Sequence, residues 1–242
     1  MATKVLVFSP TFNEVENVEK LVLEIQNSFL GVSILIVDDS STDGTTELLG
    51  RLSDQIKNLQ VIVRAKKSGI GSAHMLALGK AFEEGYDLLI TLDADLSHDP
   101  KDIVRFIEIS RTSNYLVGTR SRGGSTELTG FRLALSRGAN LLCRILLPSS
   151  LSEYTTAYRC YDRSAMRILI DTPPKDEGYS FFIEATEILY KSGVILGEIP
   201  IRFRNRTKGK SKIPSLQVFR SSIKICVLFL SRIRWRLVGG RY

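Results

Sequence analysis

The sequence has few cysteines and no long apolar run. Its three cysteines, Cys143, Cys160 and Cys226, are odd in number and far apart. This pattern argues against a disulfide framework or a zinc cluster and favours a reducing compartment. No run approaches the roughly 18 apolar residues that a membrane-spanning helix needs. The apolar stretch Val5–Phe8 is too short for a signal peptide, so we expect a cytoplasmic protein without a leader.

Acidic residues are absent from the last part of the sequence. From Ile201 to Tyr242 there are 12 lysines and arginines and no aspartate or glutamate. The 33 basic residues less these 12 leave 21 against 26 acidic ones, so the preceding part carries −5 although the whole chain carries +7. A basic segment attached to a mildly acidic body predicts an anionic partner. That partner is a phosphate-bearing ligand, a nucleic acid or an anionic membrane surface.

Apolar strand patterns alternate with helical patterns along most of the 242 residues, of which 43% are hydrophobic. The predicted strands cover Lys4–Ser9, Val32–Val37, Leu59–Val63, Leu89–Leu92, Tyr115–Gly118 and Val194–Phe203. The predicted helices cover Glu14–Phe29, Thr45–Ile56, Ser72–Glu84, Lys101–Arg111, Leu128–Leu147 and Tyr179–Ser192. This alternation predicts an α/β fold with a mostly parallel sheet flanked by helices. Pro200 interrupts the last strand and favours a place at the edge of the sheet.

Polar clusters follow three of the predicted strands. They are Pro10–Glu14, Asp38-Asp39 and Asp93-Ala94-Asp95, and the carboxyl ends of parallel strands meet at one edge of a sheet. Asp93 and Asp95 alone are equally consistent with a solvated turn. Together the three clusters favour a nucleotide site, in which the two carboxylates hold Mg²⁺ or Mn²⁺ against a diphosphate. The ring of Phe12 would stack on the base, and Asp39 would bind the ribose or the base.

A basic amphipathic helix is predicted over Ser215–Val238. Its apolar stripe has spacings of three and four residues and is surrounded by lysine and arginine, with Trp235 near its end. Such a helix either lies in a membrane interface or packs its stripe onto the preceding domain, and the sequence leaves both interpretations open. We therefore expect a catalytic domain over residues 1–213 and a separate helix over residues 214–242.

The motifs, taken in order, resemble those of the inverting family two glycosyltransferases of the GT-A fold, a Rossmann-like fold. The nearest branch resembles the polyprenyl-phosphate (dolichol-phosphate) mannose synthases and their bacterial relatives. The matching segments are Pro10–Glu14, Val37–Thr45, Lys67–Ala73, Asp93–Asp95, Glu153–Arg159 (the acceptor-site loop), Glu198–Ile201, Arg206 and Ser211-Lys212. Four residues depart from the usual pattern: Phe12 replaces tyrosine, Ser97 replaces glutamine, Glu153 replaces aspartate and Ala157 replaces glycine.

The resemblance implies a role for each matching residue. Those implied to bind the nucleotide sugar are Pro10, Phe12, Glu14, Val37, Asp39, Asp93, Ala94, Asp95, Arg206 and Lys212. Those implied in catalysis and in contacts with donor and acceptor phosphates are Asp95, Arg120, Arg132, Ser136, Glu153 and Arg206. Asp93 and Asp95 are the implied ligands of Mg²⁺ or Mn²⁺. Arg132, Ser136 and Asn140, four residues apart, share one face of the predicted helix over residues 128–147.

The expected reaction is the metal-dependent, inverting transfer of a mannose-like sugar from a nucleoside-diphosphate sugar to a polyprenyl or dolichyl phosphate. GDP-mannose is the favoured donor and a UDP-sugar the other possibility, and the enzyme is expected peripherally at the cytoplasmic face of a membrane. One alternative keeps the donor and uses a hydroxyl acceptor on a glycan or small molecule, with Glu153 as the base. Two further alternatives are an inactive nucleotide-sugar-binding module and a nucleic-acid-binding protein. We expect no nucleic acid partner, because the basic segment contains no DNA-binding or RNA-binding motif.

Overall fold

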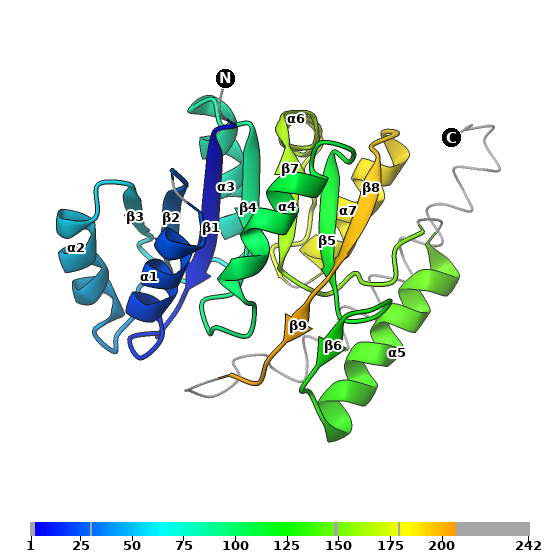
Figure 1. Cartoon of the computed structure of the whole chain (residues 1–242), viewed down its shortest axis with the longest axis horizontal. Coiled ribbons are helices and arrows are strands. Elements are labelled where there is room, and N and C mark those ends of the chain that lie inside the picture. Colours follow the sequence, from blue (N-terminus) through cyan, green and yellow to red (C-terminus); the bar gives the residue numbers. More distant parts are fainter. Residues whose placement is uncertain (1–2, 30, 148–149, 179, 207–242) are drawn as a thin grey trace.

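A seven-stranded sheet forms the centre of the molecule, with strand order β3-β2-β1-β4-β7-β5-β8 (Figure 1). The structure, a computed structural model, describes residues 3–29, 31–147, 150–178 and 180–206. The strands are β1 Val5–Thr11, β2 Ser33–Asp38, β3 Leu59–Val63, β4 Leu88–Thr91, β5 Tyr115–Thr119, β7 Arg159–Asp162 and β8 Leu196–Pro200. The mostly parallel α/β sheet predicted from the sequence is confirmed, and β8, which ends at Pro200, lies at its edge as expected.

Strand β7 was not predicted, and it runs antiparallel to both of its neighbours, β4 and β5. Its four residues, Arg159–Asp162, are too few and too polar at the ends to give a strand pattern. Because β7 is antiparallel, its first residue lies at the edge where β4 and β5 end, and Arg159 pairs with Thr91. The preceding loop, residues 153–158, is thereby held beside the end of β4.

Helices cover both faces of the sheet (Figure 1). Their bounds are α1 Val18–Ser28, α2 Thr45–Gln55, α3 Ile70–Glu83, η1 Pro100–Asp102, α4 Ile103–Ile109, α5 Gly130–Leu146, α6 Arg163–Asp171 and α7 Phe181–Lys191. Successive strand side chains point to opposite faces, so Val5 and Val7 pack with α1, α2 and α4, whereas Leu6 and Phe8 pack with α3, α6 and α7. Helix α6 was not predicted. None of the described helices is long and apolar enough to cross a membrane.

A second, two-stranded sheet joins two segments that are distant in sequence. Strand β6, Ser125–Thr126, pairs in parallel with β9, Arg202–Phe203. The backbone N–H of Arg204 then donates to the carbonyl of Ser97 at 2.9 Å. These bonds direct the chain after β8 back across the carboxyl edge of the large sheet. The predicted helix over Ser215–Val238, the boundary between residues 213 and 214, and Lys212 lie outside the described residues.

The glycines at the start of α3 allow a close backbone contact. The N–H of Gly71 donates to the carbonyl of Glu177 at 2.8 Å. A Cβ atom at Gly71 would lie 2.7 Å from the carbonyl oxygen of Asp176, and one at Gly69, where φ is +88°, would overlap the backbone of Glu177. The Gly-rich segment therefore packs α3 against the loop before α7.

We expect Gly71→Ala to lower the free energy of unfolding by about 1–3 kcal/mol, because the new Cβ atom would displace backbone. The matched control is Gly79→Ala in the same helix, where a Cβ atom meets nothing within 4 Å. This change should stabilise the protein by up to about 1 kcal/mol, since alanine favours helix over glycine. Urea unfolding of the two variants measures both values, and equal effects would contradict the close contact.

Candidate active site

Asp93 and Asp95 lie directly after β4, at the carboxyl edge of the sheet. Between Asp95 and Ser97, the backbone of Leu96 adopts the left-handed conformation with φ +60°, which is rare for a residue with a branched side chain. This turn lets the N–H and hydroxyl of Ser97 donate to Oδ1 of Asp95 at 3.0 and 2.6 Å. Ser97 therefore orients the Asp95 carboxylate.

The two carboxylates repel each other. Partial burial and the neighbouring negative charge of Asp95 raise the pKa of Asp93. Burial by itself would raise the pKa of Asp95 too, but the hydrogen bonds from Ser97 and the charge of Arg206 lower it instead. A divalent cation between the carboxylates would relieve this repulsion, and the Asp93 side chain is one-third exposed, at 34%.

The donor set fits Mg²⁺ or Mn²⁺. Among the described residues there is no group of three or more histidine, cysteine, aspartate or glutamate side chains that would enclose a metal ion. Two carboxylates beside a phosphate site are the usual protein contribution to a magnesium ion, whose remaining ligands are phosphate oxygens and water. Asp93 and Asp95 would supply those two hard ligands.

His98 connects the Asp93 turn to the 153–158 loop. Burial lowers the pKa of His98 to about 4, so the ring is neutral at physiological pH. Its Nδ1 accepts from the backbone N–H of Asp93 at 3.2 Å, which assigns the proton to Nε2, 3.2 Å from the hydroxyl of Thr156. The rings of Tyr158 and Phe203 lie against it. His98 is thus a structural link and makes no ion pair with Asp93.

Arg206 spans two of the predicted clusters. Its Nε lies 2.8 Å from Oδ2 of Asp95, and its Nη1 lies 3.3 Å from Oε1 of Glu14. The late basic motif and the first motif, 192 residues apart, therefore meet beside Asp95. In this position the guanidinium is directly beside the place where a diphosphate would bind a metal held by Asp93 and Asp95.

The predicted nucleoside end of the site contains two interactions. The ammonium group of Lys67 lies 3.9 Å from the centre of the Phe12 ring. Asp39 forms an ion pair with Arg64, which also donates to the hydroxyl of Ser72 at 2.6 Å and to the carbonyl of Gly69 at 3.0 Å. Arg64 was missed in the sequence, although it follows β3 directly and so lies at the same edge as Asp39.

Three predicted residues have more limited roles in this arrangement. The side chains of Val37 and Ala94 are buried in the two hydrophobic clusters, so only their backbone atoms can face a nucleotide. Pro10 is half-buried within β1. Asp38 is fully buried and accepts hydrogen bonds from Ser41 and Thr46, which makes it a structural residue of the turn.

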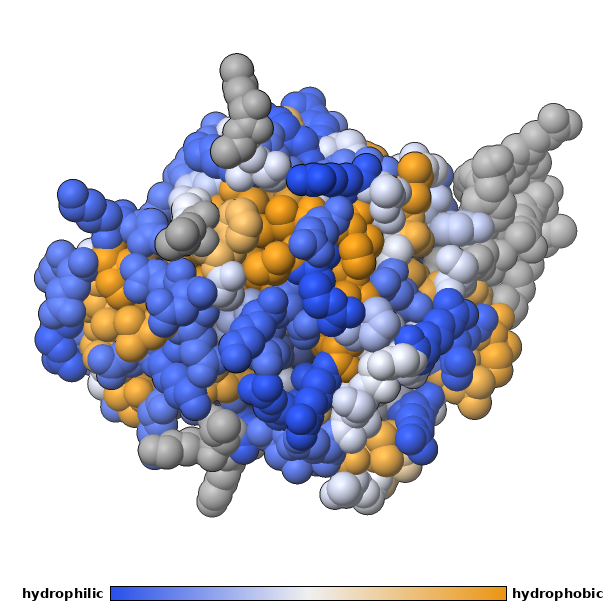
Figure 2. Space-filling model, in the orientation of Figure 1, coloured by the Kyte–Doolittle hydropathy of each residue, from blue (hydrophilic) through white to orange (hydrophobic). Residues whose placement is uncertain are grey.

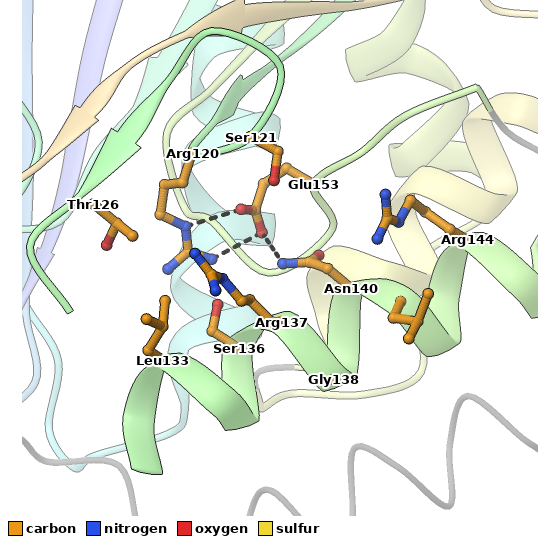
Figure 3. A pocket seen from close by; sticks show the side chains of 11 residues that line it. Arg120, Ser121, Thr126, Leu133, Ser136, Arg137, Gly138, Asn140, Arg144 and Glu153 are labelled. Carbon is orange, nitrogen blue, oxygen red and sulfur yellow. Dashed lines mark hydrogen bonds and ion pairs between the residues drawn. The ribbon is translucent and has the colours of Figure 1, made fainter. Parts of the chain in front are cut away.

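A cavity of about 390 Å³ lies between α5 and the loops after β5 and before β7 (Figure 3). Its lining includes Arg120, Ser136, Arg137, Asn140, Arg144 and Glu153. Arg120 forms a two-pronged ion pair with Glu153, Nε to Oε2 and Nη2 to Oε1, each at 2.9 Å. The amide of Asn140 donates to Oε1 of the same carboxylate at 2.8 Å. Sequence spacing placed Ser136 and Asn140 on one face of α5, and both face the cavity.

Glu153 is held as an anion. It is 1% exposed, and burial alone would raise its pKa, but the charge of Arg120 and hydrogen bonds from Arg120 and Thr155 lower the pKa instead. Both of its oxygens accept hydrogen bonds from protein groups.

Arg132, expected beside Ser136, is exposed and is not among the residues that line the cavity. Arg137 and Arg144 line the cavity and were not predicted from the sequence.

Arg159 holds the 153–158 loop in place from the interior of the protein. Its guanidinium is fully buried and donates to the carbonyls of Thr156 at 2.8 Å, Tyr154 at 2.6 Å and Phe182 at 3.1 Å. Burial lowers its pKa to about 10, which still leaves it protonated at neutral pH. The side chain therefore anchors the loop to α7 and does not face the cavity.

The comparisons with known proteins identify the family. The model of glycosyl transferase family 2 matches residues 6–169. This chain belongs to glycosyltransferase family 2. It is 30% identical over 212 residues to an undecaprenyl-phosphate mannosyltransferase of Micrococcus luteus, covering 87% of each chain. It is 31% identical over 230 residues to a polyprenol monophosphomannose synthase of Mycolicibacterium smegmatis, covering 92% of this chain and 85% of the relative.

Solved structures agree with the GT-A fold of this glycosyltransferase. Glucosyl-3-phosphoglycerate synthase of Mycobacterium tuberculosis, crystallised with Mn²⁺, UDP and glucosyl-3-phosphoglycerate, matches with a TM-score of 0.68 at 18% identity. The match covers 96% of this chain and 80% of that one. At this identity the likeness establishes the fold, and the expectation of a GT-A glycosyltransferase is confirmed.

We expect Arg159→Lys to lower the free energy of unfolding by about 3 kcal/mol, because an ammonium group cannot reach all the carbonyls that the guanidinium binds. The control is Arg167→Lys, whose side chain is 60% exposed and should change stability by less than about 0.5 kcal/mol. Hydrogen exchange should show faster opening of residues 153–158 in the first variant only. An unchanged loop would contradict the anchoring role.

Proposed function

We propose that this glycosyltransferase transfers a mannose-like sugar, with inversion, from a nucleoside-diphosphate sugar to a polyprenyl phosphate. The names of the two curated relatives support mannose as the sugar and a lipid phosphate as the acceptor. GDP-mannose is the favoured donor, and a UDP-sugar is the other candidate. The enzyme would act peripherally at the cytoplasmic face of a membrane. The observation that carries the proposal is the arginine-lined cavity whose single carboxylate among the described lining residues, Glu153, is already paired.

The donor would bind along the carboxyl edge of the sheet. Phe12 and Asp39 would hold the nucleoside, Glu14 would position Arg206, and Asp93 and Asp95 would hold Mg²⁺ or Mn²⁺. When bound, the metal ion would neutralise the charge that develops on the departing diphosphate. Arg206, 2.8 Å from Asp95, would shift to contact the same phosphates and stabilise that charge. Lys212, from outside the described residues, would add a second positive group.

The acceptor phosphate would bind in the cavity beside α5. Arg120, Ser136, Arg137 and Arg144 of the lining would supply hydrogen bonds to a phosphate, most of them charge-assisted, whereas Arg132 lies outside the lining. A phosphate monoester loses its second proton with a pKa of about 6, so its oxygen is nucleophilic at neutral pH without a base. The protein then needs only to align this oxygen with the anomeric carbon for an in-line displacement.

A hydroxyl acceptor is the alternative, and it would require Glu153 as the general base. A hydroxyl group keeps its proton at neutral pH, so a carboxylate oxygen would have to be available to remove it. The ion pair with Arg120 and the hydrogen bond from Asn140 occupy the Glu153 oxygens. This geometry favours the phosphate acceptor.

A direct test incubates the purified protein and Mn²⁺ with a short polyprenyl phosphate and each of several nucleotide sugars. Mass spectrometry of the lipid fraction should detect polyprenyl-phosphate hexose, with GDP-mannose the best donor. If no nucleotide sugar yields a lipid-linked product while a hydroxyl-bearing glycan is modified, the proposed acceptor is wrong.

We expect Asp93→Asn and Asp95→Asn each to lower metal-dependent transfer by about 100-fold or more, because each removes a hard ligand beside the leaving diphosphate. Circular dichroism should show an unchanged fold. Asp102→Asn is the matched control, since its carboxylate pairs with Arg105 on α4 and should not affect transfer. Normal turnover and unchanged metal dependence of either active-site variant would refute the metal assignment.

We expect Glu153→Gln to keep transfer to polyprenyl phosphate within about tenfold of wild type at saturating acceptor. A lost general base would instead cost about 10²–10⁴-fold. Arg137→Ala should raise the KM for the acceptor about tenfold or more, because a dianion would lose a charge-assisted hydrogen bond. Steady-state kinetics separates the two effects, with Arg111→Ala, an exposed residue after α4, as control. The reverse pattern would favour a hydroxyl acceptor.

A further inference from the structure

The outer side of α5 exposes large apolar side chains. Phe131 is 80% exposed, Ile145 is 68% exposed and Leu141 is 50% exposed. These are three of the seven exposed large hydrophobic residues in the described part of the chain, and they come from one helix. Phe131 and Ile145 are 14 residues apart, which is close to four helical turns, and Leu141 precedes Ile145 by four residues. All three therefore lie along one side of α5, a surface that we call the α5 ridge.

The α5 ridge is adjacent to the mouth of the cavity. Leu141 lines the cavity together with Ser136, Asn140 and Arg144 of the same helix. Helix α5 lies at the lower right of the molecule in Figure 1, and apolar atoms appear there on the surface in Figure 2. The opposite side of the helix is buried through Asn140 and Cys143, so the ridge faces away from the sheet.

All the charged side chains of α5 are positive. The helix contains Arg132, Arg137 and Arg144, all exposed, and no aspartate or glutamate. Arg137 precedes Leu141 by four residues and Arg144 follows it by three, so these two arginines flank the apolar stripe, whereas Arg132 lies on the face of Asn140. Such a stripe suits the interface of an anionic bilayer, where arginine meets phosphate groups and the apolar side chains enter the acyl region.

Charge also argues against the other possible occupants. A two-fold contact between two copies would bring the same arginines face to face. Residues 207–242 contain nine lysines and arginines and no acidic residue, so this segment would meet like charge on α5. Anionic lipid has the complementary charge.

We propose that the α5 ridge is a membrane-docking surface that inserts Phe131 and Ile145 into an anionic lipid bilayer and directs the cavity toward the lipid headgroups. The part that concerns the acceptor rests on the proposed function, because only a lipid-linked acceptor needs a cavity that opens at the bilayer surface. The contact with lipid itself does not depend on catalysis and is tested separately.

A single tryptophan placed on the ridge reports its depth directly. In the full-length protein, the only native tryptophan, Trp235, is changed to phenylalanine, and the ridge variant Phe131→Trp is made in this background. The matched control is Ile195→Trp in the same background, since Ile195 is 60% exposed and precedes the edge strand β8. Vesicles contain equal parts of phosphatidylglycerol and phosphatidylcholine brominated on its acyl chains.

We expect the brominated lipid to quench the fluorescence of the Phe131→Trp variant strongly and that of the Ile195→Trp variant weakly. High salt or vesicles of phosphatidylcholine alone should reduce the quenching. Equal quenching of the two variants in vesicle-bound protein, or no binding to vesicles, would refute the proposal. A blue shift in the emission of the Phe131→Trp variant without lipid would also refute it. Such a shift would indicate a second copy if it depended on concentration, and the C-terminal segment if it did not.

A second measurement separates docking from chemistry. Phe131→Ser combined with Ile145→Ser should lower the partition onto anionic vesicles about tenfold or more, whereas Ile195→Ser should not. With a short acceptor dispersed in solution, the double variant should retain wild-type transfer. Loss of soluble activity together with unchanged partition would contradict docking through this ridge. Absence of transfer in the wild type as well would count against the proposed function and leave the vesicle result valid.

Discussion

The candidate acceptor site depends on the buried ion pair between Arg120 and Glu153. It joins the end of β5 to the loop before β7, and the amide of Asn140 adds α5 to the same carboxylate at 2.8 Å. The charge of the arginine and the donated hydrogen bonds keep Glu153 ionised despite nearly complete burial. Without Arg120, the charge of Glu153 would be uncompensated at this depth and strongly destabilising, whereas a neutral glutamine at position 153 could still accept a hydrogen bond from Arg120. The pair therefore shapes the cavity and occupies both oxygens of the carboxylate.

The antiparallel strand β7 brings donor and acceptor elements together. Its first residue lies at the edge where β4 ends, so the 153–158 loop lies beside Asp93 and Asp95. His98 then bridges the two segments as a neutral ring, between the backbone N–H of Asp93 and the hydroxyl of Thr156. The bond from Arg204 to the Ser97 carbonyl positions Arg206 over the same carboxylates. Backbone topology and a few buried polar contacts thus set the distance between the proposed donor and acceptor sites.

Local sequence predicted the elements whose pattern is strong and the clusters that follow them. The alternation of apolar strands and amphipathic helices predicted the parallel part of the sheet. The end of β2 located Asp39, and the end of β4 located Asp93 and Asp95. Strand β7 was missed because four residues with polar ends carry too little periodicity. Arg64 was also missed, although its place directly after β3 puts it at the same edge as Asp39. The pairing of Glu153 with Arg120 was missed because it joins residues 33 positions apart, which no local pattern encodes.

The proposed acceptor is a lipid phosphate, aligned by arginines and deprotonated without help from the protein. The most direct measurement offers the enzyme an equimolar mixture of a short polyprenyl phosphate and the corresponding polyprenol, with GDP-mannose and Mn²⁺ at pH 8. The products are separated and identified by mass spectrometry. We expect the sugar to be found on the phosphate alone. Transfer to the alcohol at a comparable rate would contradict it, because a hydroxyl group requires a base that the paired Glu153 cannot supply.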